Sequence, residues 1–209
     1  GLAAALALVR AGFAVRVVEQ AGEFGEIGAG ITVSPNAVRA FRHLGLGAEV
    51  EQASTRVGIQ GVVYFETGKV LGTKDREAMA ARCGAPFLQL LRPDLHAILA
   101  LALLRAAPGC VTLGRSVVSV EQADGRAVVS CDDGSRMEAD LVVGADGIRS
   151  RVRACVFDAD QPRFTGRVAW RGLVPTSSIP EGLLPFASGA AVGPGRTFGW
   201  YMVRHGTLV

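Results

Sequence analysis

A glycine and an acid near the start of the chain have the spacing of a nucleotide-binding unit. Residues 1–12 are rich in alanine and leucine and end in Gly12, which is typical of a buried helix. Residues 14–19 then predict a short buried strand that ends in Glu19. In a dinucleotide-binding unit a glycine-rich turn opens the helix, and an acid about 20 residues further on binds the adenosine ribose. Gly1 and Glu19 match this pattern, although an α/β unit that binds no nucleotide fits the same segment.

Two further segments offer backbone amides and a cation to an anionic ligand. Gly28, Ala29 and Gly30 belong to a glycine-rich loop that comes shortly before a capped helix. Arg92 lies at the beginning of a second helix, where a guanidinium next to free backbone amides makes a good site for an anion. The alternative for Arg92 is a solvated surface charge.

The most informative segment is residues 140–153. Residues 140–145 predict a buried strand, which leads through Asp146 and Gly147 into a basic helix. Ligands of open α/β sheets bind beyond the carboxyl ends of the strands, where this turn is expected. The alternative for Asp146 is an ordinary turn aspartate, because Asp-Gly is frequent in turns.

No catalytic residue is identified from the sequence, because none of the three histidines has a paired base nearby. His205 is retained as the candidate, with a solvated turn residue as the alternative. Trp200 and Tyr201 are candidates for a substrate pocket, since aromatic walls suit a flat ring, and core packing is the alternative for both. The four cysteines lack the spacing of a metal site, so no metal is expected.

An α/β fold with a second, antiparallel layer must position these residues. Residues 61–72 predict a hairpin from a sheet other than the parallel one, and residues 116–139 predict a β-meander that covers the nucleotide sheet. The net charge of +3 has no block of like charge, and no apolar run spans a bilayer. Binding to nucleic acid or to a membrane is therefore not expected, and a cytoplasmic location is the default.

These segments together resemble the FAD-dependent aromatic-ring monooxygenases that include salicylate and hydroxybenzoate hydroxylases. The resemblance covers nearly the whole chain, including residues 1–19, residues 28–37 and Arg92, and it is most specific over residues 144–150. Residues 169–174 also resemble the first strand of the family's substrate domain. The cofactor-binding residues that the resemblance implies are Gly1, Glu19, Gly28, Ala29, Gly30, Arg92, Val118, Asp146 and Gly147.

The resemblance also assigns parts of the cofactor to some of these residues. It implies that Glu19 holds the adenosine ribose, Arg92 contacts the pyrophosphate and Val118 faces the adenine. The fold class that it implies is an FAD-binding Rossmann-like α/β domain with a β-meander and an inserted mixed-sheet substrate domain, truncated at both ends. The expected parts are residues 1–60 and 81–160 for binding FAD, 61–80 as a hairpin of the substrate layer, and 161–209 as the start of the substrate domain.

The activity implied is hydroxylation of a small phenolic or aromatic acid by O2, with NADH or NADPH as co-substrate and a flavin hydroperoxide as the oxygen donor. An epoxidase, an isoprenoid reductase or a halogenase of the same fold remains an alternative, as does a truncated gene product without function. The 209-residue piece itself is expected to be inactive, because the family's Gly-Asp segment for the ribityl chain belongs after Val209. Homodimer formation by the full-length protein is left open.

Overall fold

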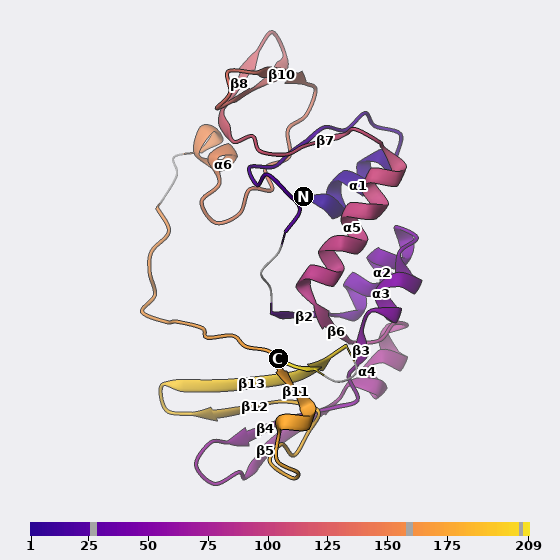
Figure 1. The fold of residues 1–209 in the computed structure, drawn as a ribbon, viewed down its shortest axis with the longest axis vertical. Coiled ribbons are helices and arrows are strands. Elements are labelled where there is room, and N and C mark those ends of the chain that lie inside the picture. The colour runs from indigo at the N-terminus through magenta and orange to yellow at the C-terminus, as the bar shows by residue number, and fades with distance from the viewer. Residues whose placement is uncertain (26–28, 158–160, 205–206) are drawn as a thin grey trace. The chain divides into compact units, whose positions relative to one another are not determined.

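The computed structural model describes residues 1–25, 29–157, 161–204 and 207–209 (Figure 1). The chain forms two compact units, each built from two segments of the sequence. The first unit contains Gly1–Gly25 and Leu99–Ala169, and the second contains Glu26–Ile98 and Trp170–Val209. The four-part division expected from the sequence stays a prediction, because compactness does not identify what each part binds.

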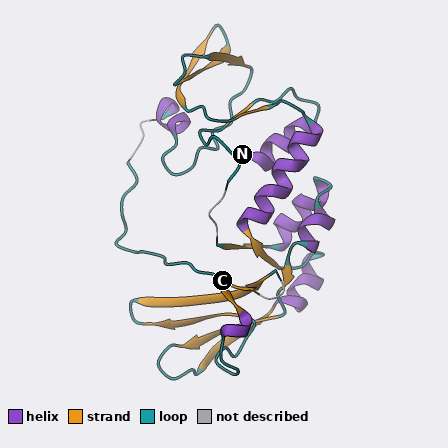
Figure 2. Cartoon of the chain, in the orientation of Figure 1, coloured by secondary structure: helices purple, strands orange, loops and turns teal. Residues whose placement is uncertain are grey.

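The first unit contains a short parallel sheet and a β-meander (Figure 2). Its elements are α1 (Leu2–Arg10), β1 (Val17–Val18), the end of α5 (Arg92–Ala106), β7 (Val111–Thr112), β8 (Val117–Ala123), β9 (Arg126–Cys131), β10 (Arg136–Ala139) and α6 (Arg151–Val156). β1 pairs with β7 in parallel, with Val17 opposite Val111. The three strands from β8 to β10 are antiparallel neighbours, as the meander predicted from the sequence requires.

The buried strand predicted over residues 140–145 is not formed. This segment is not paired with any strand, and the side chains of Leu141 and Val143 are 70% and 54% exposed. A strand is stable only when a neighbour satisfies its backbone groups, and apolar content alone does not supply that neighbour. The strand predicted over residues 14–19 is shortened to two residues for the same reason, because only Val17 and Val18 pair with β7.

The second unit contains two further sheets. Its elements are β2 (Gly30–Val33), α2 (Pro35–His43), α3 (Gly47–Gln52), β3 (Thr55–Arg56), β4 (Ile59–Tyr64), β5 (Val70–Asp75), α4 (Arg76–Cys83), β6 (Leu88–Leu91), the start of α5, β11 (Val174–Pro175), the short 3-10 helix η1 (Thr176–Ser178), β12 (Ser188–Gly193), β13 (Arg196–Val203) and β14 (Thr207–Leu208). The larger sheet has the order β11-β14-β13-β12-β4-β5, and the smaller has the order β2-β6-β3.

The larger sheet is mixed, since β12 is parallel to β4 and antiparallel to β13. The hairpin predicted over residues 61–72 is present as β4 and β5. The predicted strand over residues 169–174 is largely absent, because only Val174 and Pro175 pair with β14 and Trp170 is 94% exposed. The α/β class with parallel and mixed sheets is confirmed.

Trp200 of β13 forms the centre of the core of the larger sheet. Its side chain is 2% exposed, packs with Val63, and donates a hydrogen bond from Nε1 to the carbonyl of Phe186 over 2.7 Å. A Cβ atom at Gly189 would lie 2.7 Å from the indole ring and 2.8 Å from the carbonyl oxygen of Gly61. Glycine at position 189 therefore allows the indole to lie directly on β12.

Among the described residues, no helix is long and apolar enough to cross a membrane.

Candidate functional site

In the first unit, the beginning of α1 lies beside the Asp-Gly turn. A Cβ atom at Gly1 would lie 3.7 Å from the Cβ atom of Ala145, which is an ordinary contact distance. Gly1 accepts the first hydrogen bond of α1, from the amide of Ala5 over 3.0 Å. The structure thus brings together two segments that are far apart in the sequence, and it places backbone amides of a helix start next to the turn at Asp146 and Gly147.

The carboxylate of Asp146 organises this turn. It accepts hydrogen bonds from the hydroxyl of Ser150, from the amide of Arg151 over 2.6 Å and from the amide of Val152 over 3.1 Å. Burial opposes ionisation of Asp146, but the hydrogen bonds from Ser150 and from the backbone outweigh burial and lower its pKa below the ordinary value. Gly147 follows with a φ of +80°, which glycine adopts without strain. Asp146 therefore has a structural role at the start of α6.

Glu19 directly follows the parallel strand β1. Its backbone is fixed to the neighbouring strand, since the amide of Glu19 donates to the carbonyl of Thr112 over 2.9 Å. The side-chain Oε1 accepts a hydrogen bond from the amide of Ala21 over 2.9 Å. A carboxylate has about four lone-pair positions, so this arrangement orients the group and leaves acceptor capacity for the hydroxyls of a ribose.

Val118 of β8 lies at an irregularity of the meander. The register between β8 and β9 shifts between Val117 and Ser119, so that Val118 has no paired partner. Its side chain is 50% exposed. A β-bulge changes the direction of a side chain that would otherwise follow the regular alternation along the strand. An exposed branched apolar side chain of this kind can pack against a flat ring.

In the second unit, the glycine-rich loop and Arg92 are adjacent. The amide of Arg92 donates to the carbonyl of Ala29 over 3.1 Å, and Gly30 pairs with Leu91 between β2 and β6. Arg92 is the first residue of α5 and is exposed. The structure thus combines a guanidinium, a helix start and the loop backbone in one place, which is a donor set for an anion.

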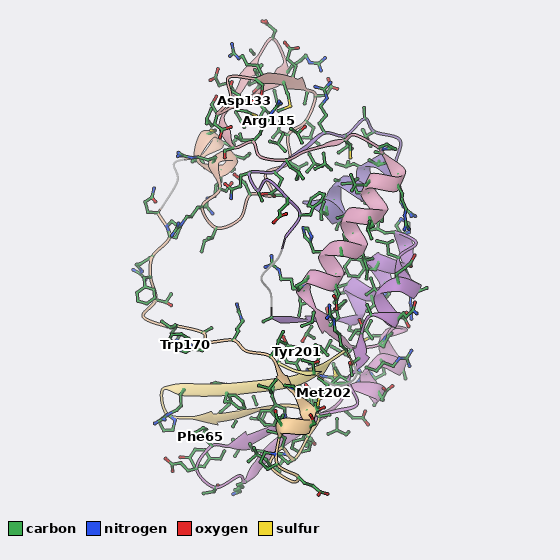
Figure 3. The ribbon with its side chains drawn as sticks, in the orientation of Figure 1. Phe65, Arg115, Asp133, Trp170, Tyr201 and Met202 are labelled. Atoms are coloured by element: carbon green, nitrogen blue, oxygen red, sulfur yellow. The ribbon has the colours of Figure 1, made fainter. Side chains whose placement is uncertain are left out.

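Tyr201 covers the beginning of β2. A Cβ atom at Gly30 would lie 2.4 Å from the ring and 2.7 Å from the hydroxyl oxygen of Tyr201, so only glycine leaves room for the phenol. Tyr201 is labelled in Figure 3. Burial raises the pKa of Tyr201, and the positive charge of Arg171 opposes this shift. Trp200, its neighbour on β13, is packed in the core, which is the alternative stated for it from the sequence.

Two of the sequence candidates, Gly28 and His205, lie outside the described residues. In the described part of the chain, no group of three or more His, Cys, Asp or Glu side chains is arranged to hold a metal ion.

Some polar residues of the second unit were missed by the sequence analysis. Gln89 and Ser188 are each 3% exposed, and Gln89 Nε2 donates to Ser188 Oγ over 3.1 Å. Arg204, at the end of β13, forms an ion pair with Asp94 in the first turn of α5. The available signal was Gln89 itself, since it interrupts an apolar run that is otherwise typical of a buried strand. No signal in the sequence joins Arg204 to Asp94.

The residues present fit FAD in the chemistry of their donors and acceptors. The fit rests on the carboxylate of Glu19, which directly follows a parallel strand, and on the exposed Arg92 at the start of α5, next to Ala29 of the glycine-rich loop. The first suits ribose hydroxyls and the second suits a pyrophosphate.

Comparisons with known proteins also indicate an FAD-binding chain. A family model described as FAD binding domain matches residues 1–180. The 6-hydroxynicotinate 3-monooxygenase of Pseudomonas fluorescens is 35% identical over 188 residues, which are 89% of this chain and 48% of the relative. The 3-hydroxybenzoate 6-hydroxylase of Polaromonas naphthalenivorans (strain CJ2) is 38% identical over 211 residues, covering 99% of this chain and 52% of the relative.

Solved structures agree with these relatives. The structure of Klebsiella pneumoniae HpxO complexed with FAD and uric acid has a TM-score of 0.86 and 29% sequence identity, covering 100% of this chain and 52% of that chain. The chain spans about half the length of the curated relatives it matches. Since the family model covers most of the chain and the relatives are aromatic hydroxylases, this chain belongs to the FAD binding domain family of flavin-dependent aromatic monooxygenases.

Proposed function

We propose that this chain provides FAD-binding and substrate-binding parts of an enzyme that hydroxylates a small phenolic or aromatic acid with O2 and NADH or NADPH. The observation that carries the proposal is the geometry of the first unit, in which Glu19 directly follows the parallel strand β1 and Gly1 lies beside the turn at Asp146 and Gly147. The matched relatives act on hydroxylated aromatic acids by name, which supports the substrate class.

The residues have separate roles in this proposal. Glu19 accepts hydrogen bonds from the adenosine ribose, and Val118 packs against the adenine. Arg92 and the backbone around Ala29 bind the pyrophosphate. The turn at Asp146 and Gly147 contacts the cofactor mainly through its backbone, because hydrogen bonds within the chain already use most of the acceptor capacity of the Asp146 carboxylate.

Bound FAD would supply the oxygen-transfer chemistry, with NADH or NADPH as the reductant and O2 as the source of oxygen. The chain's own contribution is to bind and orient the substrate and to exclude water. Tyr201 is the described residue proposed to hold the substrate, because a phenol hydroxyl is protonated at neutral pH and can donate a hydrogen bond. Burial raises the pKa of this hydroxyl further. Its ring lies against Gly30, so the position of this hydroxyl is fixed by the backbone of β2.

Titration with FAD tests the cofactor part of the proposal. We expect the protein to bind FAD with quenching of flavin fluorescence, and Glu19→Gln to weaken binding roughly tenfold, because an amide accepts fewer hydrogen bonds from the ribose than a carboxylate. Glu23→Gln is the matched control, since Glu23 is exposed on the loop just beyond. Equal affinity of the Glu19→Gln and Glu23→Gln variants would overturn the assignment of Glu19.

Oxidation of NADH or NADPH tests the reaction. We expect a panel of small hydroxybenzoates to stimulate oxidation of the nicotinamide cofactor by the FAD-loaded full-length enzyme that contains this chain, with one hydroxylated product formed. Stimulation by an alkene or by halide with no response to any hydroxybenzoate would instead indicate an epoxidase or a halogenase.

A further inference from the structure

A pocket in the second unit is not used by the proposed FAD contacts. It has a volume of about 330 Å³, which is within the size range of small-molecule sites. Both sheets of the second unit contribute to it, together with the segment before β12. The lining residues that matter are Arg56, Ile59, Gln89, Phe186, Ser188 and Met202.

The polar wall of the pocket is buried and only partly hydrogen-bonded within the chain. Gln89 and Ser188 are each 3% exposed and are joined by one hydrogen bond of 3.1 Å. Thr55, which lines the same pocket, has a buried Oγ1 without a hydrogen-bond partner in the described part of the chain. Buried polar groups are rarely left unpaired, so this wall suits a ligand with a hydroxyl or similar group.

The apolar wall is fixed by the core of the larger sheet. A Cβ atom at Gly61 would lie 2.1 Å from the ring of Phe186, so glycine allows this ring to lie directly on β4. The carbonyl of Phe186 accepts the hydrogen bond from Trp200, and Met202 packs in the same cluster. An aromatic ring and a thioether together favour a flat, apolar ligand.

A guanidinium lies at the rim of the pocket. The side chain of Arg56 is 62% exposed, and its Nη2 is 3.6 Å from Oε2 of Glu51. Glu51 has a closer partner, because Nε and Nη2 of Arg42 donate to its Oε1 over 2.9 and 2.7 Å. Arg56 can therefore turn toward an anion while the charge of Glu51 remains compensated.

We infer that this pocket binds a small aromatic carboxylate, at a position separate from the one proposed at Tyr201, which does not line the pocket. The ring packs against Phe186 and Met202, the carboxylate pairs with Arg56, and a ring hydroxyl bonds to the amide of Gln89. The inference rests on the proposed function only in the class of compound chosen. Binding to these residues requires neither FAD nor O2, so the two proposals can fail separately.

Calorimetric titration of the 209-residue chain with 3-hydroxybenzoate, without FAD, tests this inference. We expect saturable binding at one site. 3-Hydroxybenzyl alcohol keeps the ring and the hydroxyl but lacks the carboxylate, and Arg56→Gln removes the cation. Each change should weaken binding roughly tenfold, as expected for loss of one charged hydrogen bond. The matched control is Arg39→Gln, an exposed arginine on α2 that does not line the pocket, and it should bind as the original chain does.

Trp200 reports whether the ligand occupies this pocket. The chain has two tryptophans, so Trp170→Phe leaves Trp200 as the single one, and it is bonded to the carbonyl of the pocket residue Phe186. 3-Hydroxybenzoate should change the emission of Trp200 with the same affinity as that found by calorimetry. Absence of saturable heat, equal binding of the acid and the alcohol, or an unchanged affinity in Arg56→Gln would each overturn the inference. Loss of FAD binding with intact carboxylate binding would overturn the proposed function alone.

Discussion

At the scale of single residues, the structure assigns Asp146 a role that its turn sequence does not reveal. The sequence identified the turn by its position after an apolar run, which is a signal for ligand binding. The carboxylate instead accepts three hydrogen bonds from residues 150–152. These hydrogen bonds depend on the residues that follow the turn. A sequence motif therefore predicts where a residue lies in the fold better than it predicts which groups form hydrogen bonds with that residue.

Replacement of Asp146 by Asn should destabilise the protein by about 1 kcal/mol, since an amide nitrogen cannot accept from the backbone of α6. The pKa of Asp146 is lowered in the folded state, so its stabilisation is present above the ordinary aspartate pKa and is lost as the pH falls below it. Urea unfolding at pH 7 and at about pH 3 should show the difference between the two proteins shrinking in acid. Asp140→Asn, a 91% exposed side chain in the same segment, should show no such difference at pH 7.

Replacement of Gly30 by Ala should displace the ring of Tyr201. The new Cβ atom would lie 2.4 Å from the ring, and overpacking of this kind costs about 1–3 kcal/mol. Tyr201→Ala in the same chain should remove most of the penalty, because the two changes concern one contact. Thermal unfolding of the single and double variants measures this coupling, and additive effects would contradict the contact. Gly172→Ala, where the space is open, is the control.

At the scale of elements, local sequence patterns correctly predicted the helices, hairpins and meanders that are stabilised by contacts between residues near in the sequence. The helix α1, the hairpin of β4 and β5, and the meander of β8 to β10 were predicted because their spacing and turn residues lie within short segments. The parallel pairing of β4 with β12 joins segments far apart in the sequence, and no local pattern encodes it. For the same reason, the apolar run over residues 140–145 predicted a strand that has no partner.

The ion pair between Arg204 and Asp94 joins the end of β13 to the first turn of α5. Arg204 Nε donates to Asp94 Oδ2 over 2.9 Å, and a second contact is made through Nη2. The side chain of Arg204 is 57% exposed, so Arg204→Gln should cost less than about 1 kcal/mol, and the loss should shrink as salt screens the charges. Unfolding curves at low and high salt measure this. A loss of unfolding free energy that does not depend on salt would indicate that Arg204 acts through packing rather than through its charge. Arg196→Gln serves as the comparison variant.

At the scale of the whole molecule, the first unit exposes an apolar segment. Leu141, Ile148, Phe164 and Val168 are 67–75% exposed, which is unusual for so many apolar side chains within one short region. We expect the chain to self-associate as its concentration rises. Light scattering should detect this, and Leu141→Lys combined with Ile148→Lys should reduce it. Two lysine substitutions at exposed polar positions of the same unit, Gln20→Lys and Gln122→Lys, add the same charge without removing apolar surface and should leave association unchanged.

The pairing of β4 with β12 also has a consequence for folding during synthesis of the protein. During synthesis, β4 and β5 leave the ribosome early, whereas β12 follows only after the whole return segment of the first unit has been made. At about 5–20 residues per second, this delay is on the order of ten seconds. For that time the hairpin presents an unpaired edge. A released chain that ends before residue 188 should therefore be far more sensitive to protease than the 209-residue chain, which contains β12.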